Sequence, residues 1–96
     1  KILEKNYRSA LGEIDLIMED KDTTVFIEVR SRKNNSILDA VETIDQRKRK
    51  KIVQTSQQYL QNIKKSTNLY YRFDVIAIHG DLNDKNIEWI KNAFDA

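Results

Sequence analysis

The chain has no cysteine and one histidine, His79, among its 96 residues. Without cysteine there is neither a disulfide framework nor a thiolate zinc site. A single imidazole also excludes a metal centre built from several histidines. The sequence therefore excludes disulfide-stapled scaffolds and histidine-rich zinc enzymes.

Long apolar runs and proline are also missing. No apolar stretch approaches the roughly 20 residues needed to span a bilayer, and no signal-like start is visible. We therefore expect a cytoplasmic protein with no membrane partner. There is no internal repeat, proline-rich linker or low-complexity tail, and a hydrophobic content of 40% suits one modest core. The expected organisation is a single domain over residues 1–96.

Two alternating apolar segments, GEIDLI at 12–17 and VFIEVRSR at 25–32, predict a β-hairpin. Side chains alternate between the two faces of a strand, so a slip of one residue would invert one strand relative to the other. Centring the turn on Lys21 and Asp22 matches the apolar faces throughout. The expected pairs are then Ile14 with Val29, Leu16 with Ile27, and Met18 with Val25.

The opposite face of this hairpin gathers charge, because the same register pairs Asp15 with Glu28 and Glu13 with Arg30. Directly opposed carboxylates have Cβ atoms roughly 5 Å apart and repel unless a cation lies between them. Hard oxygen ligands this close suit Mg²⁺ or Mn²⁺, and the Val29 carbonyl is a candidate further ligand. The alternative is a surface charge cluster in which an arginine bridges the acids and contributes little stability.

The rest of the pattern predicts one long helical segment and three further strands. A loop at 33–36 precedes predominantly helical sequence over 37–65, broken near Thr43, with an apolar stripe formed by Ile52, Val53, Ser56, Tyr59, Leu60 and Ile63. The expected strands are Ile2 to Arg8, Leu69 to His79 and Asn86 to Ile90, with Gly12 free to take a positive φ after the first turn.

One acid and three aromatic residues near the C-terminus have both structural and functional interpretations. Asp74 lies in a strand that is apolar on both faces, so we expect Arg72, Tyr71 or a backbone donor to satisfy its carboxylate. A secondary role near a metal is the alternative. Trp89 is expected to pack against the core and not to bind a ligand, while Tyr70 and Tyr71 are either core residues or platforms on which unpaired bases stack.

Positive charge is concentrated between Arg30 and Lys51, where eight Lys or Arg residues accompany three Asp or Glu residues. The density peaks in the run RKRKK at 47–51, which predicts phosphate contacts and binding that weakens with salt. A solvated helix turn is the alternative. The candidate nucleic-acid-binding residues are Arg8, Arg32, Lys33, Arg47, Arg49, Lys50 and Lys51. Arg8 has a second interpretation, which is an ion pair with Glu13.

Lys48 differs from its neighbours because it lies on the inward helical stripe, four residues before Ile52 and seven after Val41. A lysine there needs a polar destination, and the carboxylate patch is the obvious candidate. Gln46, which lies off the stripe, is an alternative occupant of that role. The structural interpretation is a snorkelling lysine whose amine reaches water.

Five ordered segments, NYRSALGEIDLI, VFIEVRSR, TSQQYL, YRFDVIAIHG and IEWIKNAF, resemble the YraN-like family of uncharacterised bacterial proteins over essentially the whole chain. Asp15, Glu28 and Arg30 also match the three motif positions of the PD-(D/E)xK nuclease superfamily. The resemblance implies an α/β fold with a restriction-endonuclease-like core, in which a long helix packs on a mixed sheet of about five strands. It also implies that Lys48 or Gln46 is supplied to the active site from that helix.

Two departures from the family pattern bear on function. Arg30 stands where the superfamily usually has lysine, and a guanidinium stays charged, so we expect it to stabilise phosphate charge and not to accept a proton. The amphipathic helix that normally precedes KILEKNYR in the family is missing. We therefore expect this chain to be truncated at its N-terminus.

Together these features predict a divalent-metal-dependent endonuclease that hydrolyses nucleic-acid phosphodiesters. DNA is favoured over RNA, and branched or single-stranded DNA is suggested by analogy alone. The expected catalytic residues are Asp15, Glu28, Arg30 and Lys48, the expected ligands of Mg²⁺ or Mn²⁺ are Asp15, Glu28 and Val29, and the auxiliary residues are Glu13 and Gln46. Two other functions stay open, namely a catalytically inactive nucleic-acid-binding module on the same fold and a protein-interaction domain. A homodimer also stays open.

Overall fold

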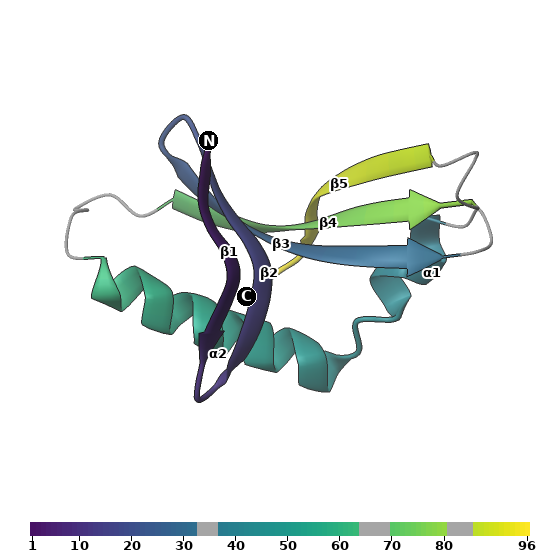
Figure 1. The fold of residues 1–96 in the computed structure, drawn as a ribbon. Coiled ribbons are helices and arrows are strands. Elements are labelled where there is room, and N and C mark those ends of the chain that lie inside the picture. The colour runs from purple at the N-terminus through teal and green to yellow at the C-terminus, as the bar shows by residue number, and fades with distance from the viewer. Residues whose placement is uncertain (33–36, 64–69, 81–85) are drawn as a thin grey trace.

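A mixed five-stranded sheet and two helices form the fold (Figure 1). The structure is a computed structural model that describes residues 1–32, 37–63, 70–80 and 86–96. Its strands are β1 (Ile2–Ser9), β2 (Gly12–Asp20), β3 (Thr23–Arg32), β4 (Tyr70–His79) and β5 (Asn86–Phe94), and its helices are α1 (Ile37–Glu42) and α2 (Gln46–Asn62). These elements confirm the predicted α/β class with one main helix on a mixed sheet.

The central hairpin has the register that the alternating pattern predicts. Leu16 pairs with Ile27 and Met18 with Val25, and Lys21 turns the chain with a φ of 58°. The backbone ladder between β2 and β3 ends at the Leu16–Ile27 pair. Three predicted ladder pairs lie beyond that point, and they are therefore wrong as backbone pairs: Ile14 with Val29, Asp15 with Glu28, and Glu13 with Arg30.

The two helices connect β3 to β4, which pair in parallel from Thr23–Tyr70 to Arg32–His79. Parallel neighbours need such a crossover, because their connection must return along the length of the sheet. The other three strand pairs are antiparallel, and the spatial order of the strands follows the chain, so β1 and β5 are the edges.

The core lies between α2 and the sheet face that it covers (Figure 1). α2 contributes Ile52, Tyr59 and Leu60, which meet Phe26 of β3 and Phe73 of β4. The predicted helical stripe is confirmed, with Ser56 also buried and Val53 and Ile63 partly buried. No helix within the described ranges is long and apolar enough to cross a membrane.

The helical region is divided as predicted, with a break between Glu42 and Gln46. Asp45 caps α2, because its Oδ1 accepts a hydrogen bond of 2.9 Å from the Lys48 amide. Arg49 joins the two helices, and its Nε donates to the Ile44 carbonyl at 2.7 Å. The helix ends at Asn62 with Ile63 as its C-cap, and residues 64 and 65 of the predicted helix lie outside the described residues.

β5 continues to Phe94 and is therefore longer than the predicted strand, which ended at Ile90. Asn92 has a positive φ of 53°, and the register with β4 shifts between Phe73 and Val75. This irregularity interrupts the alternation that reveals a strand in sequence. Beyond it, Phe94 stacks on Phe73 with ring centroids 5.1 Å apart.

The buried carboxylate of Asp74 is fully hydrogen-bonded, as the structural interpretation predicts. Arg72 Nε donates to Oδ1 at 3.0 Å and the Asn92 amide donates to Oδ1 at 2.9 Å. Trp89 Nε1 donates to Oδ2 at 2.8 Å, a contact that the sequence did not indicate. Trp89 itself is 46% exposed. The Nε1 edge of the indole is bonded to the buried Asp74, while the rest of the ring is partly exposed.

Gly12 begins β2 beneath α2, and its φ is not positive, which corrects the prediction. A Cβ atom at this position would lie 2.9 Å from Thr55 Oγ1. That hydroxyl is buried and donates to the Lys51 carbonyl at 2.8 Å, so it is not free to move away. Gly12 therefore permits the close approach of α2 to β2.

We expect Gly12→Ala to lower the free energy of unfolding by about 1–3 kcal/mol, because the added methyl overpacks a tight contact. Urea unfolding of the purified variant measures the change. Thr55→Ala in the Gly12→Ala background should recover part of the loss, since it removes the atom that the new methyl meets. A variant as stable as the original chain would show that α2 does not approach β2 this closely.

Candidate functional site

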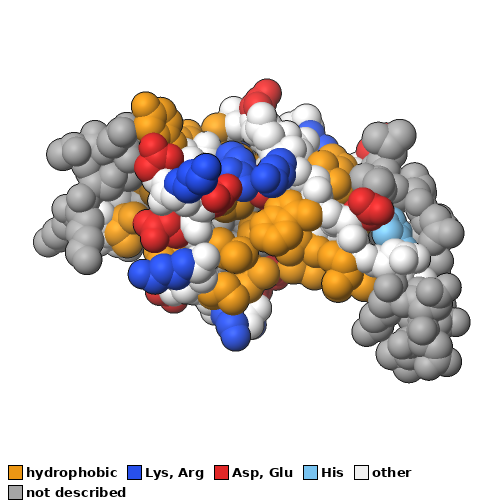
Figure 2. Space-filling model, turned by 90° about the horizontal axis from the view of Figure 1, so that it is seen from above, with side chains coloured by type: hydrophobic (Ala, Val, Ile, Leu, Met, Phe, Trp, Pro, Cys, Tyr) orange, Lys and Arg blue, Asp and Glu red, His pale blue; other side chains and the backbone are white. Residues whose placement is uncertain are grey.

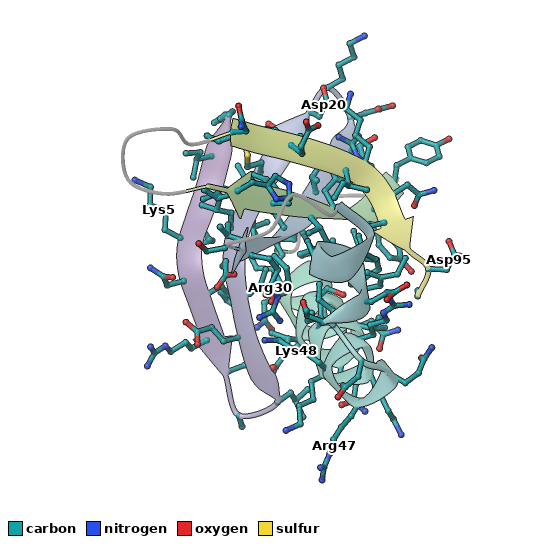
Figure 3. The ribbon with its side chains drawn as sticks, turned by 90° about the vertical axis from the view of Figure 1, so that its right-hand side faces the viewer. Lys5, Asp20, Arg30, Arg47, Lys48 and Asp95 are labelled. Atoms are coloured by element: carbon teal, nitrogen blue, oxygen red, sulfur yellow. The ribbon has the colours of Figure 1, made fainter. Side chains whose placement is uncertain are left out.

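A hollow of about 330 Å³ lies between α2 and the diverging ends of β2 and β3. Its lining comprises Gly12, Glu13 and Asp15 from β2, Glu28, Val29 and Arg30 from β3, and Lys48, Lys51 and Ile52 from α2. Figure 3 shows Arg30 and Lys48 side by side between the sheet and the helix. The candidate carboxylates and cations thus reach one space from three elements.

Glu28 is the most deeply buried charged residue of this hollow, with 5% of its surface exposed. Its Oε2 lies 3.3 Å from Arg30 Nη2 and 3.5 Å from Lys48 Nζ. Burial raises the pKa of Glu28, and the nearby negative charge of Asp15 raises it further, whereas Lys48 and Arg30 act in the opposite direction. The net effect is a raised pKa, so the two cations only partly offset burial and the second carboxylate.

Asp15 occupies the place where the β2–β3 ladder has ended. Its Oδ2 accepts a hydrogen bond of 2.9 Å from the Val29 amide, so a side chain joins the strands where backbone pairing has stopped. The carboxylate is only partly buried and lines the same hollow as Glu28. Asp15 also lines a second hollow with Lys5, Asn6, Leu16 and Val29, so it lies in the gap between the two strands and borders the hollow of Glu28 from there.

Arg30 has unused hydrogen-bonding capacity. Its Nε and Nη2 atoms are buried and have no hydrogen-bond partner in the part of the chain that the structure describes. The contact of Nη2 with Glu28 is an ion pair without hydrogen-bond geometry. Buried donors without a hydrogen-bond partner are rare in proteins, and they indicate a functional site or a place for a water molecule or an ion.

Lys48 lies in the first turn of α2 and reaches inward to Glu28, the polar destination that its place on the stripe predicts. Its side chain is 45% exposed, so it borders the mouth of the hollow. Gln46 is exposed and does not line the hollow. Of the two residues predicted to serve the site from this helix, the structure brings Lys48 to it.

Two further predicted residues lie at the rim. Glu13 lines the hollow and pairs with Arg8 at 3.4 Å, which is the alternative that the sequence left open for Arg8. Both side chains are well exposed, so this pair adds little stability. Val29 lines the hollow and gives its amide to Asp15, while its carbonyl as a metal ligand stays a prediction.

The donor set suits a hard cation bound through few protein ligands. Among residues 1–32, 37–63, 70–80 and 86–96, no group of three or more His, Cys, Asp or Glu is placed to hold a metal ion. A cation here would depend on Asp15 and Glu28 together with water or phosphate oxygens. Mg²⁺ is commonly bound in this way, through one or two carboxylates.

The basic run on α2 has two kinds of member. Arg47, Lys50 and Lys51 are exposed, and Figure 3 shows Arg47 extending away from the body of the molecule. Arg49 is partly buried, bonds the end of α1, and lies over the Phe94 ring at 5.3 Å. The sequence did not indicate this structural role, because Phe94 lies far from Arg49 along the chain. The side chain of Arg32 and the whole of Lys33 lie outside the described part.

Comparison with known proteins shows what this chain is similar to. The family described as "Uncharacterised protein family UPF0102" matches residues 1–78. A UPF0102 protein of Vibrio campbellii is 44% identical over 94 residues, which are 97% of this chain and 75% of that protein. A UPF0102 protein of Pseudomonas fluorescens is 43% identical over 96 residues, which are 100% of this chain and 78% of that protein.

The raised pKa of Glu28 predicts how Glu28→Gln changes stability with pH in metal-free buffer. A carboxyl whose pKa is higher in the folded state stabilises the fold below its unfolded pKa, and this contribution is lost as pH rises through the folded pKa. Relative to the original chain, the variant should therefore gain stability from about pH 4 upward and then level off. Urea unfolding of both proteins across this range measures the difference. A variant that loses relative stability as pH rises would show that the ion pairs outweigh burial.

Proposed function

This chain belongs to the uncharacterised protein family UPF0102, and from the geometry of its hollow we propose that it is a divalent-metal-dependent nuclease that hydrolyses nucleic-acid phosphodiesters. The proposal includes a place in the PD-(D/E)xK superfamily. The mixed sheet with α2 packed on it and the position of Asp15, Glu28 and Arg30 around one hollow support that placement.

One observation carries the proposal. A buried carboxylate, Glu28, shares an open hollow with a second carboxylate, Asp15, and its pKa is raised although two cations lie within 3.5 Å. Burying like charges together is unfavourable unless a counter-charge joins them. We propose that Mg²⁺ or Mn²⁺, held by Asp15 and Glu28, is that counter-charge.

Each residue of the hollow has a role in this proposal. When bound, the cation would polarise a phosphate oxygen and lower the pKa of a water molecule. Arg30 donates its unpaired N–H groups to the phosphate and stays charged throughout, so it stabilises the negative charge that grows in the transition state. Lys48 adds a second positive charge from α2, and Glu13 orients water at the rim.

The exposed residues of α2 would hold the nucleic-acid backbone. Arg47, Lys50 and Lys51 are exposed and lie near Lys48 on the first turns of the helix. Contacts to phosphate position a duplex or single strand without reading its bases. We propose DNA in preference to RNA, and the superfamily analogy favours branched or single-stranded DNA.

A catalytically inactive nucleic-acid-binding module is the second candidate, and a specific observation favours it. Arg30 and Lys48 already lie against Glu28 Oε2, so the protein itself supplies positive charge where a cation would bind. If these contacts persist in solution, Glu28 serves as an anchor for two phosphate-binding cations and not as a metal ligand. Metal binding separates the two candidates.

We expect Mn²⁺ at about a hundredfold excess over its Kd to raise the melting temperature by ~10 °C, because binding to the folded state stabilises it. Asp15→Asn should abolish the rise, whereas Asp22→Asn, an exposed acid at the hairpin tip, should keep it. Thermal denaturation with and without Mn²⁺ measures the effect. No rise in the original chain would leave the binding module as the better candidate.

We also expect Glu28→Gln to lower cleavage of branched or single-stranded DNA by at least ~100-fold, since a metal ligand supplies several kcal/mol of transition-state stabilisation. Gel-based cleavage assays with Mn²⁺ measure the rates, and circular dichroism checks that the variant is folded. Equal cleavage by the variant would exclude Glu28 from the catalytic site.

For the basic helix, Lys51→Gln should weaken DNA binding and reduce the slope of log affinity against log salt concentration by about 1, the value for one lost phosphate contact. Lys21→Gln is the matched control, because Lys21 is exposed in the turn between β2 and β3, at the opposite end of β2 from Gly12, where Lys51 lies close. Fluorescence anisotropy with labelled DNA at several salt concentrations gives both slopes. An unchanged slope for Lys51→Gln would remove α2 from the binding surface.

A further inference from the structure

Two arginines of the sheet, Arg30 on β3 and Arg72 on β4, are equally buried but differ in their bonding. Each side chain is 20% exposed. Arg72 Nε donates to Asp74 at 3.0 Å, and its Nη1 donates to Asp20 at 3.2 Å. Because Arg72 precedes the core residue Phe73, it lies on the sheet face away from α2, where cationic side chains lie beside acidic ones (Figure 2). Arg72 thus has acidic hydrogen-bond partners within the sheet.

Arg30 is bonded less completely. Its buried Nε and Nη2 atoms have no hydrogen-bond partner within residues 1–32, 37–63, 70–80 and 86–96. Nη2 lies 3.3 Å from Glu28 Oε2, but without hydrogen-bond geometry. The planar guanidinium donors match the oxygens of a phosphate group, which can accept two of them side by side. The N–H groups of Arg30 are therefore suited to an oxyanion.

Lys48 contacts the same oxygen of Glu28 from α2, with its Nζ at 3.5 Å. Charge-assisted hydrogen bonds between nitrogen and a carboxylate are about 2.7–2.9 Å long, so the contacts of both cations with Glu28 are loose. The Lys48 side chain is 45% exposed and flexible, so its amine can change partner while the helix stays in place. Neither cation is bound tightly to Glu28.

The hollow has room for an anion beside these cations. Its volume is about 330 Å³, which corresponds to roughly ten water molecules of about 30 Å³ each. Lys51 lines it together with Arg30 and Lys48. A phosphodiester group that enters the hollow therefore meets three positive side chains.

A divalent cation at Glu28 would compete with Arg30 and Lys48 for one carboxylate. Like charges at such distances repel strongly where water is partly excluded. An anion in the hollow gives the two side chains another partner and reduces this repulsion. Binding of the anion then favours binding of the cation, and by linkage the cation favours the anion to the same degree.

We propose that Arg30 and Lys48 exchange partners in the hollow. They neutralise Glu28 in the free protein and turn to a phosphodiester anion when one enters, so that the anion and the divalent cation bind with positive coupling. This inference rests on the proposed function, because it takes Asp15 and Glu28 as the ligands of the cation. It adds that the phosphate of the substrate itself completes the metal site.

Mn²⁺ titrations followed by electron paramagnetic resonance test the coupling, with and without dimethyl phosphate. This anion carries the phosphodiester group of a nucleic acid without sugars or bases. A saturating concentration should lower the Kd for Mn²⁺ by at least ~5-fold, at the lower end of ordinary coupling between sites. Sodium chloride at the same ionic strength is the control, because it screens charge without offering a phosphate group.

Arg30→Gln and Lys48→Gln test the exchange of partners. Without dimethyl phosphate, each should lower the Kd for Mn²⁺ by ~5-fold or more, because each removes one positive charge that competes for Glu28. Each should also reduce the effect of dimethyl phosphate. Lys91→Gln is the matched control, since Lys91 is an exposed cation on β5 outside this hollow, and its Kd should not change. Circular dichroism checks that the variants are folded.

An equal Kd with and without dimethyl phosphate would overturn the coupling and leave the metal site of the nuclease in place. An unchanged or higher Kd in both Arg30→Gln and Lys48→Gln would also overturn it, because the two cations would then not compete for Glu28. The same fall in Lys91→Gln would show that overall charge sets the affinity. Coupled binding in a chain that cleaves no DNA would support the exchange and contradict the nuclease. No Mn²⁺ binding under either condition would overturn both.

Discussion

The hydrogen bond from the Val29 amide to the Asp15 carboxylate is the constraint on which the candidate site depends. The ladder between β2 and β3 ends at Leu16 and Ile27, and this bond of 2.9 Å joins the strands beyond that point. Because a side chain takes over from the backbone, Asp15 is fixed beside Glu28 while the strands separate enough to leave a hollow. Gly12 then lets α2 come close to β2, and Lys48 reaches Glu28 from the helix.

Glu28 shows the balance of forces at this site. Burial and Asp15 raise its pKa, while Lys48 and Arg30 favour its charged form without fully compensating. Elsewhere in the sheet Asp74 is even more deeply buried, but donors from Arg72, Trp89 and Asn92 satisfy it completely. Asp74 is therefore an acid with a structural role, whereas the groups around Glu28 do not fully compensate for the burial of its charge. Incomplete satisfaction of buried polar groups is common at functional sites.

The sequence predicted those features that follow from local alternation and periodicity. The pairing of Leu16 with Ile27 followed because a one-residue slip would have turned apolar side chains to the wrong face. The inward position of Lys48 followed from its spacing to Ile52 on a helix. The early end of the hairpin ladder, the contact of Arg49 with Phe94 and the exposed position of Trp89 depend on residues far apart in the chain or on local irregularities such as Asn92. No short sequence pattern encodes these contacts.

The central claim is that Asp15 and Glu28 bind one divalent cation between them. A titration of the protein with Mn²⁺, followed by electron paramagnetic resonance, measures this directly, because free Mn²⁺ gives a sharp signal that is lost on binding. The account predicts a single bound ion per chain, absent in Asp15→Asn and in Glu28→Gln and retained in Asp22→Asn. Binding that survives in both site variants, or no binding in the original chain, would contradict it.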